Sequence, residues 1–238
     1  MKKLSPKDNI VVLTGAGISA ESGIRTFRDS GGLWENHRIE DIATYSGFRK
    51  NPALVWEFYR KRWEQSKIAK PNAAHYALVE LEHYFNDSFT LITQNVDGLH
   101  TKAGNLSVVE MHGSLNRCYC TSCKHGLSME EADAKQLIPL CPICGSYLRP
   151  DIVWFGEIPI SLFEIENSLK KCDVFIIIGT SGVVYPAAGF VMTAKLMGAK
   201  TIAINLESPD NLTFLDEFYK GKSGDILPGL VKEWTGIG

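Results

Sequence analysis

A glycine-rich segment near the start of the chain has the residues to bind a phosphate or another anion. Residues 15–28 directly follow the apolar stretch 10–14, which is typical of a buried parallel strand. Glycines after such a strand let the backbone approach the pyrophosphate of a dinucleotide. A hydride-transfer domain also places an acidic residue at the tip of a second strand, about twenty residues further on. Here no second strand-like run precedes that interval, which contains Arg25 and Arg28. The segment therefore predicts an anion site, and a plain tight turn is the alternative.

Four cysteines are spaced as ligands of one metal ion. They form two CxxC pairs, Cys120 with Cys123 and Cys141 with Cys144, separated by seventeen residues. Each CxxC turn offers two thiolates, and two such turns complete a tetrahedral zinc site. Because four protein ligands leave no open position for water or substrate, this zinc is expected to be structural. Cysteines that are merely buried are the alternative.

Hydrogen-bonding residues follow four apolar runs where the predicted strands end. These segments are 94–100, 112–114, 179–181 and 205–207. Open α/β sheets bind their ligands at the carboxyl ends of strands, so four such endings favour one shared site over independent polar turns. Among the histidines, His112 is the one placed to act, because a neutral imidazole at a strand end can serve as a general base near neutral pH.

The elements that must position these residues alternate between strands and helices. Strand-like runs occupy 9–14, 89–93, 108–111, 174–179 and 201–205, and helical patterns occupy 52–66, 73–85, 160–171, 187–197 and 224–234. This alternation predicts an α/β fold in which a Rossmann-like parallel sheet carries helices on both faces.

Two stretches interrupt the alternation and are expected to form a smaller zinc-binding and helical module. The stretch 31–70 looks helical, and the stretch 114–150 is turn-rich and carries the cysteine pairs. The predicted Rossmann-like domain then consists of 1–30, 71–113 and 151–238. A cleft between this domain and the smaller module is expected to hold the site.

Composition narrows the class of protein further. The chain has 238 residues, of which 45% are hydrophobic and 22% charged, as is ordinary for a soluble globular protein. A net charge of -2 predicts neither a nucleic-acid partner nor an anionic membrane partner. No signal peptide and no run as long as a transmembrane helix is visible, so the six cysteines favour a reducing compartment. We expect a cytoplasmic protein, and a monomer.

Together, these blocks resemble the sirtuin family of NAD-dependent protein-lysine deacylases. The matching segments follow the family's order and cover nearly the whole chain: 15–28, 93–100, 112–113, the two CxxC pairs, 153–157, 179–181 and 205–207. The resemblance implies that NAD is a consumed co-substrate and that the zinc ion, one per chain, is structural. It implies acyl-lysine proteins as substrates, with nicotinamide and O-acyl-ADP-ribose as products.

The resemblance also assigns roles to individual residues. His112 would deprotonate a ribose hydroxyl, while Asn95 and Asp97 would orient the ribose and the nicotinamide pocket. Phe27 and Arg28 belong to a loop expected to close over the nicotinamide. The residues expected to bind NAD are Gly15, Ala16, Gly17, Glu21, Phe27, Arg28, Gln94, Asn95, Asp97, Gly179, Thr180, Ser181, Asn205, Leu206, Glu207 and Ser223.

The substrate peptide is expected to bind as an added strand between 153–157 and 182–185, where main-chain bonding tolerates many sequences. The residues of the first segment are Val153, Trp154, Phe155, Gly156 and Glu157.

Tyr59 and Arg62 carry the expectation about the acyl group. They share one face of the helical pattern that begins after Asn51, and without context they would be an exposed pair. In the family, Tyr-x-x-Arg at this place marks members that remove succinyl, malonyl or glutaryl groups by binding the distal carboxylate. The planar fork of arginine suits a carboxylate, and Ala43 matches the small residue that leaves room for the longer chain. We expect removal of succinyl and malonyl groups, and of acetyl groups as well.

Three other functions are open alternatives. A mono-ADP-ribosyltransferase would transfer label from NAD onto protein, but His112 and the peptide clamp argue against it. A dehydrogenase would reduce the nicotinamide, and the missing ribose acid argues against that. A non-enzymatic zinc-bearing interaction module would need no polar residues at its strand ends.

Overall fold

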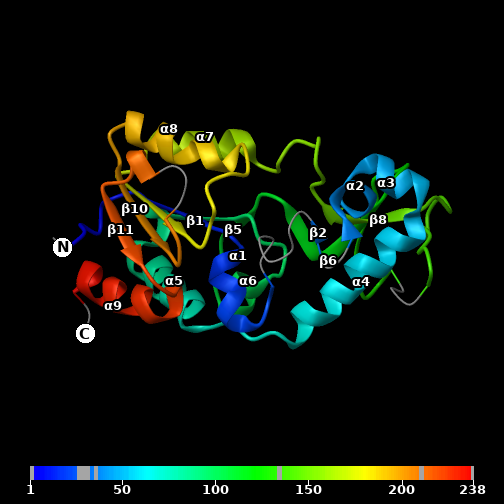
Figure 1. Cartoon of the computed structure of the whole chain (residues 1–238), viewed down its shortest axis with the longest axis horizontal. Helices are drawn as coiled ribbons and strands as arrows, with labels where there is room; N and C mark the ends of the chain where they lie inside the picture. Colours follow the sequence, from blue (N-terminus) through cyan, green and yellow to red (C-terminus); the bar gives the residue numbers. More distant parts are fainter. Residues whose placement is uncertain (1–2, 26–32, 35–36, 133–135, 209–211, 237–238) are drawn as a thin grey trace.

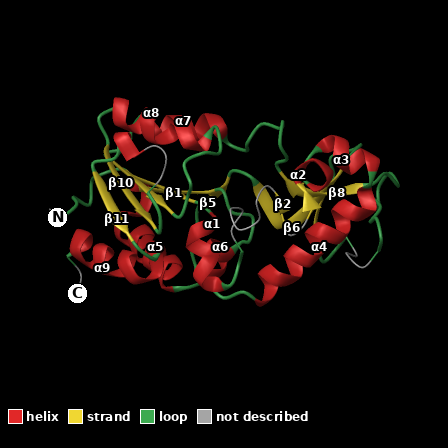
Figure 2. Cartoon of the chain, viewed as in Figure 1, coloured by secondary structure: helices red, strands yellow, loops and turns green. Residues whose placement is uncertain are grey.

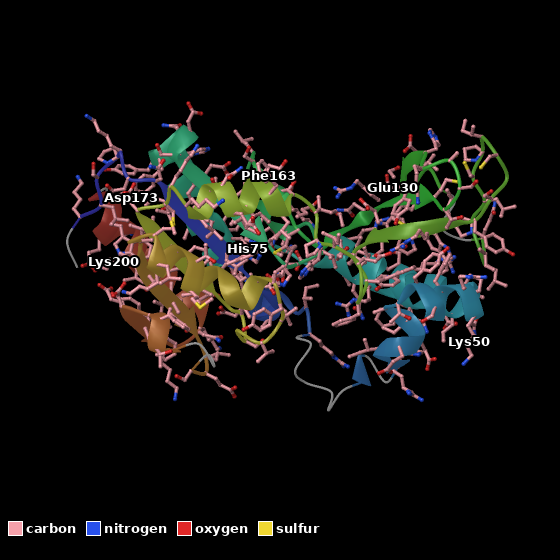
Figure 3. The ribbon with its side chains drawn as sticks, turned by 90° about the horizontal axis from the view of Figure 1, so that it is seen from above. Lys50, His75, Glu130, Phe163, Asp173 and Lys200 are labelled. Atoms are coloured by element: carbon pink, nitrogen blue, oxygen red, sulfur yellow. The ribbon has the colours of Figure 1, made fainter. Side chains whose placement is uncertain are left out.

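The computed structural model describes the whole chain except residues 1–2, 26–32, 35–36, 133–135, 209–211 and 237–238. A larger module built on a parallel sheet lies beside a smaller module along the long axis of the molecule (Figure 1). Seen from above, Asp173 and Lys200 lie on the larger module, and Lys50 and Glu130 lie on the smaller one (Figure 3). Within the described ranges, no helix combines apolar character with the length of a transmembrane span.

The larger module contains a six-stranded parallel sheet in the order β11-β10-β9-β1-β4-β5. Its strands are β1 (Ile10–Thr14), β4 (Phe89–Thr93), β5 (Val108–Glu110), β9 (Val174–Ile178), β10 (Lys200–Asn205) and β11 (Glu217–Lys220). This is the Rossmann strand order. The chain adds β4 and β5 on one side of β1 and then β9, β10 and β11 on the other, so the topological switch point lies between β1 and β9. Thr14 lies opposite both Thr93 and Ile178, so three strands end at one edge. The predicted fold class is confirmed, and each of the five predicted strands agrees with the structure to within one residue at either end.

Helices cover both faces of this sheet (Figure 2). One side carries α1 (Ala16–Ser19), α5 (Ala73–Phe85), α6 (Leu99–Ala103) and α9 (Ser223–Thr235), and the other carries α7 (Leu162–Leu169) and α8 (Phe190–Leu196). Successive side chains of a strand point to opposite faces. Ile10 and Val12 accordingly pack in the core beneath α5 and α9, whereas Val11 and Leu13 pack against α7 and α8. The fully apolar sequence of β1 is explained by this two-sided burial.

Two of the predicted helices are shorter in the structure. The helix expected over 160–171 is α7, and the one expected over 187–197 begins with a 3-10 turn, η4 (Ala187–Gly189), before α8. Further 3-10 turns are η1 (Ala20–Ser22), η3 (Asn86–Ser88) and η5 (Leu212–Phe214).

The smaller module combines helices with an antiparallel sheet. Its elements are β2 (Leu33–Trp34), β3 (His37–Arg38), α2 (Ile39–Ile42), α3 (Tyr45–Lys50), α4 (Pro52–Ile68), β6 (Gly113–Cys120), β7 (Gly126–Ser128) and β8 (Leu148–Ile152). The three strands β7, β6 and β8 form one sheet in that order. The side chain of Asn51 caps α4 by accepting from the Leu54 N–H at 3.1 Å, and Pro52 opens the helix as predicted.

Residues of α4 and of the antiparallel sheet share a single hydrophobic core. Trp56 and Tyr59 of α4 pack in it with Leu148 of β8 and with Trp154. The stretches 31–70 and 114–150 are therefore in contact. Trp154 belongs to this core although the predicted boundary after residue 150 assigns it to the larger domain.

Candidate active site

A cavity of about 520 Å³ opens between the two modules at the carboxyl edge of the parallel sheet. Most of the predicted site residues line it: Gly15, Ala16, Gly17, Ala43, Tyr59, Arg62, Gln94, Asn95, Asp97, His112, Val153, Trp154, Phe155, Gly156, Glu157, Gly179, Thr180, Ser181, Asn205, Leu206 and Glu207. Glu21 and Ser223 line a second cavity of about 210 Å³ that shares Gly17 and Asn205 with the first. Phe27 and Arg28 lie outside the described residues.

The glycine segment turns at the switch point between β1 and β9. The Gly15 N–H donates to the Ile178 carbonyl at 2.9 Å, and the Gly17 N–H donates to the Gly179 carbonyl at 2.8 Å. A Cβ on Gly17 would lie 2.7 Å from the Gly179 Cα, so a larger residue would force the two loops apart. These glycines are thus required by the packing of one loop on another, in addition to any approach to a phosphate.

Ser19 joins the two predicted catalytic residues that follow β4. Its hydroxyl donates to the Asp97 Oδ2 at 2.7 Å and accepts from the Asn95 Nδ2 at 3.1 Å. The Asn95 amide also donates to the Gly15 carbonyl at 3.1 Å, which ties this loop to the glycine turn. Burial raises the pKa of the Asp97 carboxyl, opposed by hydrogen bonds from Leu99 and Ser19. Sequence analysis gave Ser19 no role, and it was one of two serines in the glycine segment.

A second network of buried hydrogen bonds holds the loop after β4. The Thr93 hydroxyl accepts from the Asn95 N–H at 3.0 Å and from the Thr14 hydroxyl at 2.8 Å. The Thr14 oxygen lies 2.9 Å from the His100 Nε2. Burial lowers the pKa of His100 to about 3, so this ring is neutral at pH 7. The loop after β4 is therefore held on two sides before any ligand binds.

His112 lies between β5 and β6, half-buried in the wall of the cavity. Its Nδ1 is 3.2 Å from the Gln94 carbonyl oxygen. Because a carbonyl only accepts, Nδ1 carries the hydrogen and Nε2 holds the lone pair. Burial lowers the pKa of His112 more than the hydrogen bond to Gln94 raises it. The imidazole is therefore neutral at pH 7, as a general base must be.

Tyr59 and Arg62 of α4 point into the protein and line the cavity. Tyr59 is fully buried and Arg62 is 9% exposed, so they do not form an exposed pair. The Trp154 Nε1 donates to the Tyr59 hydroxyl at 3.1 Å. The backbone carbonyl of Ala43, at the end of α2, accepts from the Phe155 N–H at 3.0 Å, which fixes the 153–157 segment against α2. Gln65 and Ser66, which sequence analysis did not single out, also line the cavity; their positions three and four residues after Arg62 were the available signal.

The second cavity contains a buried polar atom that a ligand could satisfy. The Ser223 Oγ is buried there with no hydrogen-bond partner in the described part of the chain. A buried hydroxyl without a partner is costly, and a ligand hydroxyl or ring nitrogen would satisfy it.

The four predicted cysteine ligands meet at one end of the smaller module. Their sulfurs all lie within 4.8 Å of one another, with 3.4 Å between Cys120 and Cys144 and 3.7 Å between Cys123 and Cys141. Zn–S bonds of about 2.3 Å in a tetrahedron separate sulfurs by about 3.8 Å. The cluster is thus compatible with a structural zinc ion. It lies beside β6 and β8, which hold one wall of the cavity.

Removing zinc is expected to unfold the smaller module. Ligand thiolates tie β6 to the turn before β8, so loss of the ion should lower the free energy of unfolding by several kcal/mol. Metal analysis before and after treatment with a strong chelator, followed by thermal melting, measures this. Cys172→Ala, which changes a buried cysteine outside the cluster, should keep one zinc per chain. Unchanged melting of the metal-free protein would contradict the structural role.

Comparison with known proteins gives consistent matches over almost all of the chain. The model of the Sir2 family matches residues 15–186. An NAD-dependent protein deacylase of Shewanella oneidensis is 48% identical over 225 residues, covering 94% of this chain and 93% of that protein. A protein of the same name from Vibrio vulnificus is 50% identical over 233 residues, covering 96% and 94%.

Solved structures match over similar lengths. A mutant Sir2 homologue in complex with ADP-ribose superposes with a TM-score of 0.90 at 40% identity, covering 97% of this chain and 94% of that chain. A Sir2 homologue in complex with NAD superposes with a TM-score of 0.88 at 38% identity, covering 99% and 96%.

Proposed function

The chain belongs to the Sir2 family and is an NAD-dependent protein deacylase, and from this premise we propose that it removes succinyl and malonyl groups, as well as acetyl groups, from lysine side chains. The observation that supports this choice of acyl group is the placement of Arg62 and Tyr59. Both are buried in the wall of the cavity that also contains His112. A guanidinium and a phenol can both bind a distal carboxylate, which a purely apolar acyl chain lacks.

The proposed roles of the site residues follow from their positions. The backbone of Gly15, Ala16 and Gly17 would face the pyrophosphate, and Gln94 would contact the ribose hydroxyls. Asn205 and Ser223, which line the second cavity, and Glu207, which lines the first, would hold the adenosine. NAD supplies the glycosidic bond that breaks and the ribose that carries the acyl group away.

His112, Asn95 and Asp97 are the proposed catalytic residues. Asn95 and Asp97 are fixed by Ser19 and orient the nicotinamide ribose. The His112 Nε2 would accept the proton of a ribose hydroxyl, and its Nδ1–H bond to the Gln94 carbonyl keeps the ring in the required tautomer.

The remaining proposals concern substrate, organisation and location. Substrate proteins would present the acyl-lysine in an extended segment between 153–157 and 182–185. The residues 1–30, 71–113 and 151–238 would form the Rossmann-like domain and 31–70 with 114–150 the smaller one. We further propose a cytoplasmic monomer without nucleic-acid or membrane partners.

Mass spectrometry of reaction products tests the proposed function. Peptides of one sequence that carry succinyl, malonyl, glutaryl or acetyl lysine are incubated with NAD and the zinc-loaded protein, with reactions lacking NAD as controls. Equal amounts of free-lysine peptide, nicotinamide and O-acyl-ADP-ribose are expected from the succinyl and malonyl peptides. Turnover of the acetyl peptide alone would refute the dicarboxylic preference, and ADP-ribose attached to protein without lysine release would favour a mono-ADP-ribosyltransferase.

A further inference from the structure

The indole of Trp154 contacts Tyr59, one of the two residues proposed to bind the acyl carboxylate. Its Nε1 lies 3.1 Å from the Tyr59 hydroxyl oxygen, and both side chains are buried. An indole N–H can only donate, so the Tyr59 oxygen is the acceptor of this bond. The hydroxyl hydrogen of Tyr59 therefore points away from Trp154.

The position of Trp154 is itself fixed by an ion pair between a buried arginine and a partly exposed glutamate. Arg149, which is 3% exposed, donates from two nitrogens to the two carboxylate oxygens of Glu157 at 2.6 and 3.0 Å. The same carboxylate accepts from the Trp154 backbone N–H at 2.8 Å. The Arg149 guanidinium carbon also lies 3.4 Å from the centroid of the Trp154 ring. Backbone and ring of Trp154 are thus both held, so the indole N–H has a fixed direction.

We propose that Trp154 is a positioning residue for acyl selectivity, whose indole N–H orients the Tyr59 hydroxyl as a hydrogen-bond donor to the distal carboxylate of the acyl group. This inference rests on the proposed preference for dicarboxylic acyl groups. It adds a residue that acts through Tyr59 rather than by touching the carboxylate.

Two physical effects give this arrangement its value. Burial raises the pKa of Tyr59 above its ordinary value, so the phenol keeps its hydrogen and remains a donor at every working pH. A hydroxyl that accepts one hydrogen bond is polarised and donates a stronger second one. Arg62 then contributes the charge, and Tyr59 contributes a directed neutral donor. An acetyl group has no carboxylate to receive that bond, so the effect is confined to dicarboxylic substrates.

Replacement of Trp154 by phenylalanine tests the role of the N–H. The Trp154→Phe variant is expected to lower the succinyl-to-acetyl ratio of kcat/KM by about three- to tenfold, the worth of one hydrogen bond. The loss should lie mainly in the KM of the succinyl peptide, because binding of the carboxylate does not change during the reaction. Substitution of Trp154 by 3-benzothienylalanine keeps the bicyclic shape and lacks only the N–H. It should lower the succinyl-to-acetyl ratio of kcat/KM to the same extent, and it serves as the test if the phenylalanine variant is unstable.

Trp56→Phe is the matched control. Trp56 is equally buried in the same core, and its Nε1 donates to the Leu148 carbonyl at 2.9 Å instead of to Tyr59. Trp56→Phe should lower the free energy of unfolding without changing the ratio of succinyl to acetyl turnover.

A double-mutant cycle separates positioning from general structural support. If Trp154 acts through Tyr59, adding Trp154→Phe to Tyr59→Phe should lower the ratio no further. Additive effects in the cycle, or an unchanged ratio in Trp154→Phe, would overturn this inference. The proposed function would still stand if the wild-type protein prefers the succinyl peptide and this preference depends on Arg62. A wild-type protein with no activity on succinyl peptide would overturn both.

Discussion

Replacing His112 with alanine is expected to lower kcat/KM for deacylation by about 10²–10⁴-fold, the usual contribution of a general base. The imidazole is a neutral titratable group on the cavity wall. Its tautomer is set by the hydrogen bond from Nδ1 to the Gln94 carbonyl oxygen, at 3.2 Å. Steady-state assays with succinyl and acetyl peptides measure the loss, and both substrates should lose equally because the ribose hydroxyl is common to them. A variant that retains wild-type turnover of either peptide would exclude His112 as the base.

The pH dependence of the wild-type enzyme gives an independent check on the same residue. A base works only when it is unprotonated, so activity falls as the pH drops through the pKa of His112. Because burial places this pKa below its ordinary value of 6.5, the acid limb of kcat/KM should be centred below pH 6.5. His83→Ala, which changes an exposed histidine, should keep this profile. An acid limb centred above pH 7 would show that a different group limits the rate.

The features that sequence analysis predicted best depend on local patterns. The helix over 73–85 agrees with α5 at both ends, because its periodicity and its capping residue Asn72 are both encoded within one short segment. The convergence of polar residues at one sheet edge was predictable because parallel strands present their carboxyl ends together. β11 was not predicted, since Glu217–Lys220 is a short edge strand with charged ends and forms only by pairing with β10.

Contacts between distant segments were beyond prediction from residue types. Trp154 and Tyr59 are 95 positions apart, and no local periodicity relates them. The packing of the smaller module brings them together, because α4 and the 153–157 segment share one core. Glu157 illustrates the same limit. Its place in a matching segment predicted substrate binding, which stays a prediction, and the structure adds that its carboxylate accepts from Arg149 and from the Trp154 backbone N–H.

The charge of Arg62 should decide between dicarboxylic and acetyl substrates. Replacing Arg62 with methionine keeps the length of a buried side chain and removes the charge. An acyl carboxylate in this pocket would then be left without its charged partner, which typically costs about 3–5 kcal/mol. The Arg62→Met variant is therefore expected to lose about 10²–10⁴-fold in kcat/KM on succinyl peptide and much less on acetyl peptide.

Paired assays on the two peptides measure this change in preference without depending on the amount of active enzyme. Lys61→Met is the matched control, because it removes one positive charge from the adjacent, exposed position of α4, where the lysine pairs with Glu57 at 2.6 Å. This control should keep the wild-type ratio, since an exposed charge is screened by solvent and does not face the cavity. Equal losses of Arg62→Met on both peptides would mean that the guanidinium supports the fold of α4 rather than the acyl group. A loss confined to succinyl peptide requires the carboxylate to lie within reach of α4, and this is the geometry in which the Tyr59 hydroxyl can donate to it.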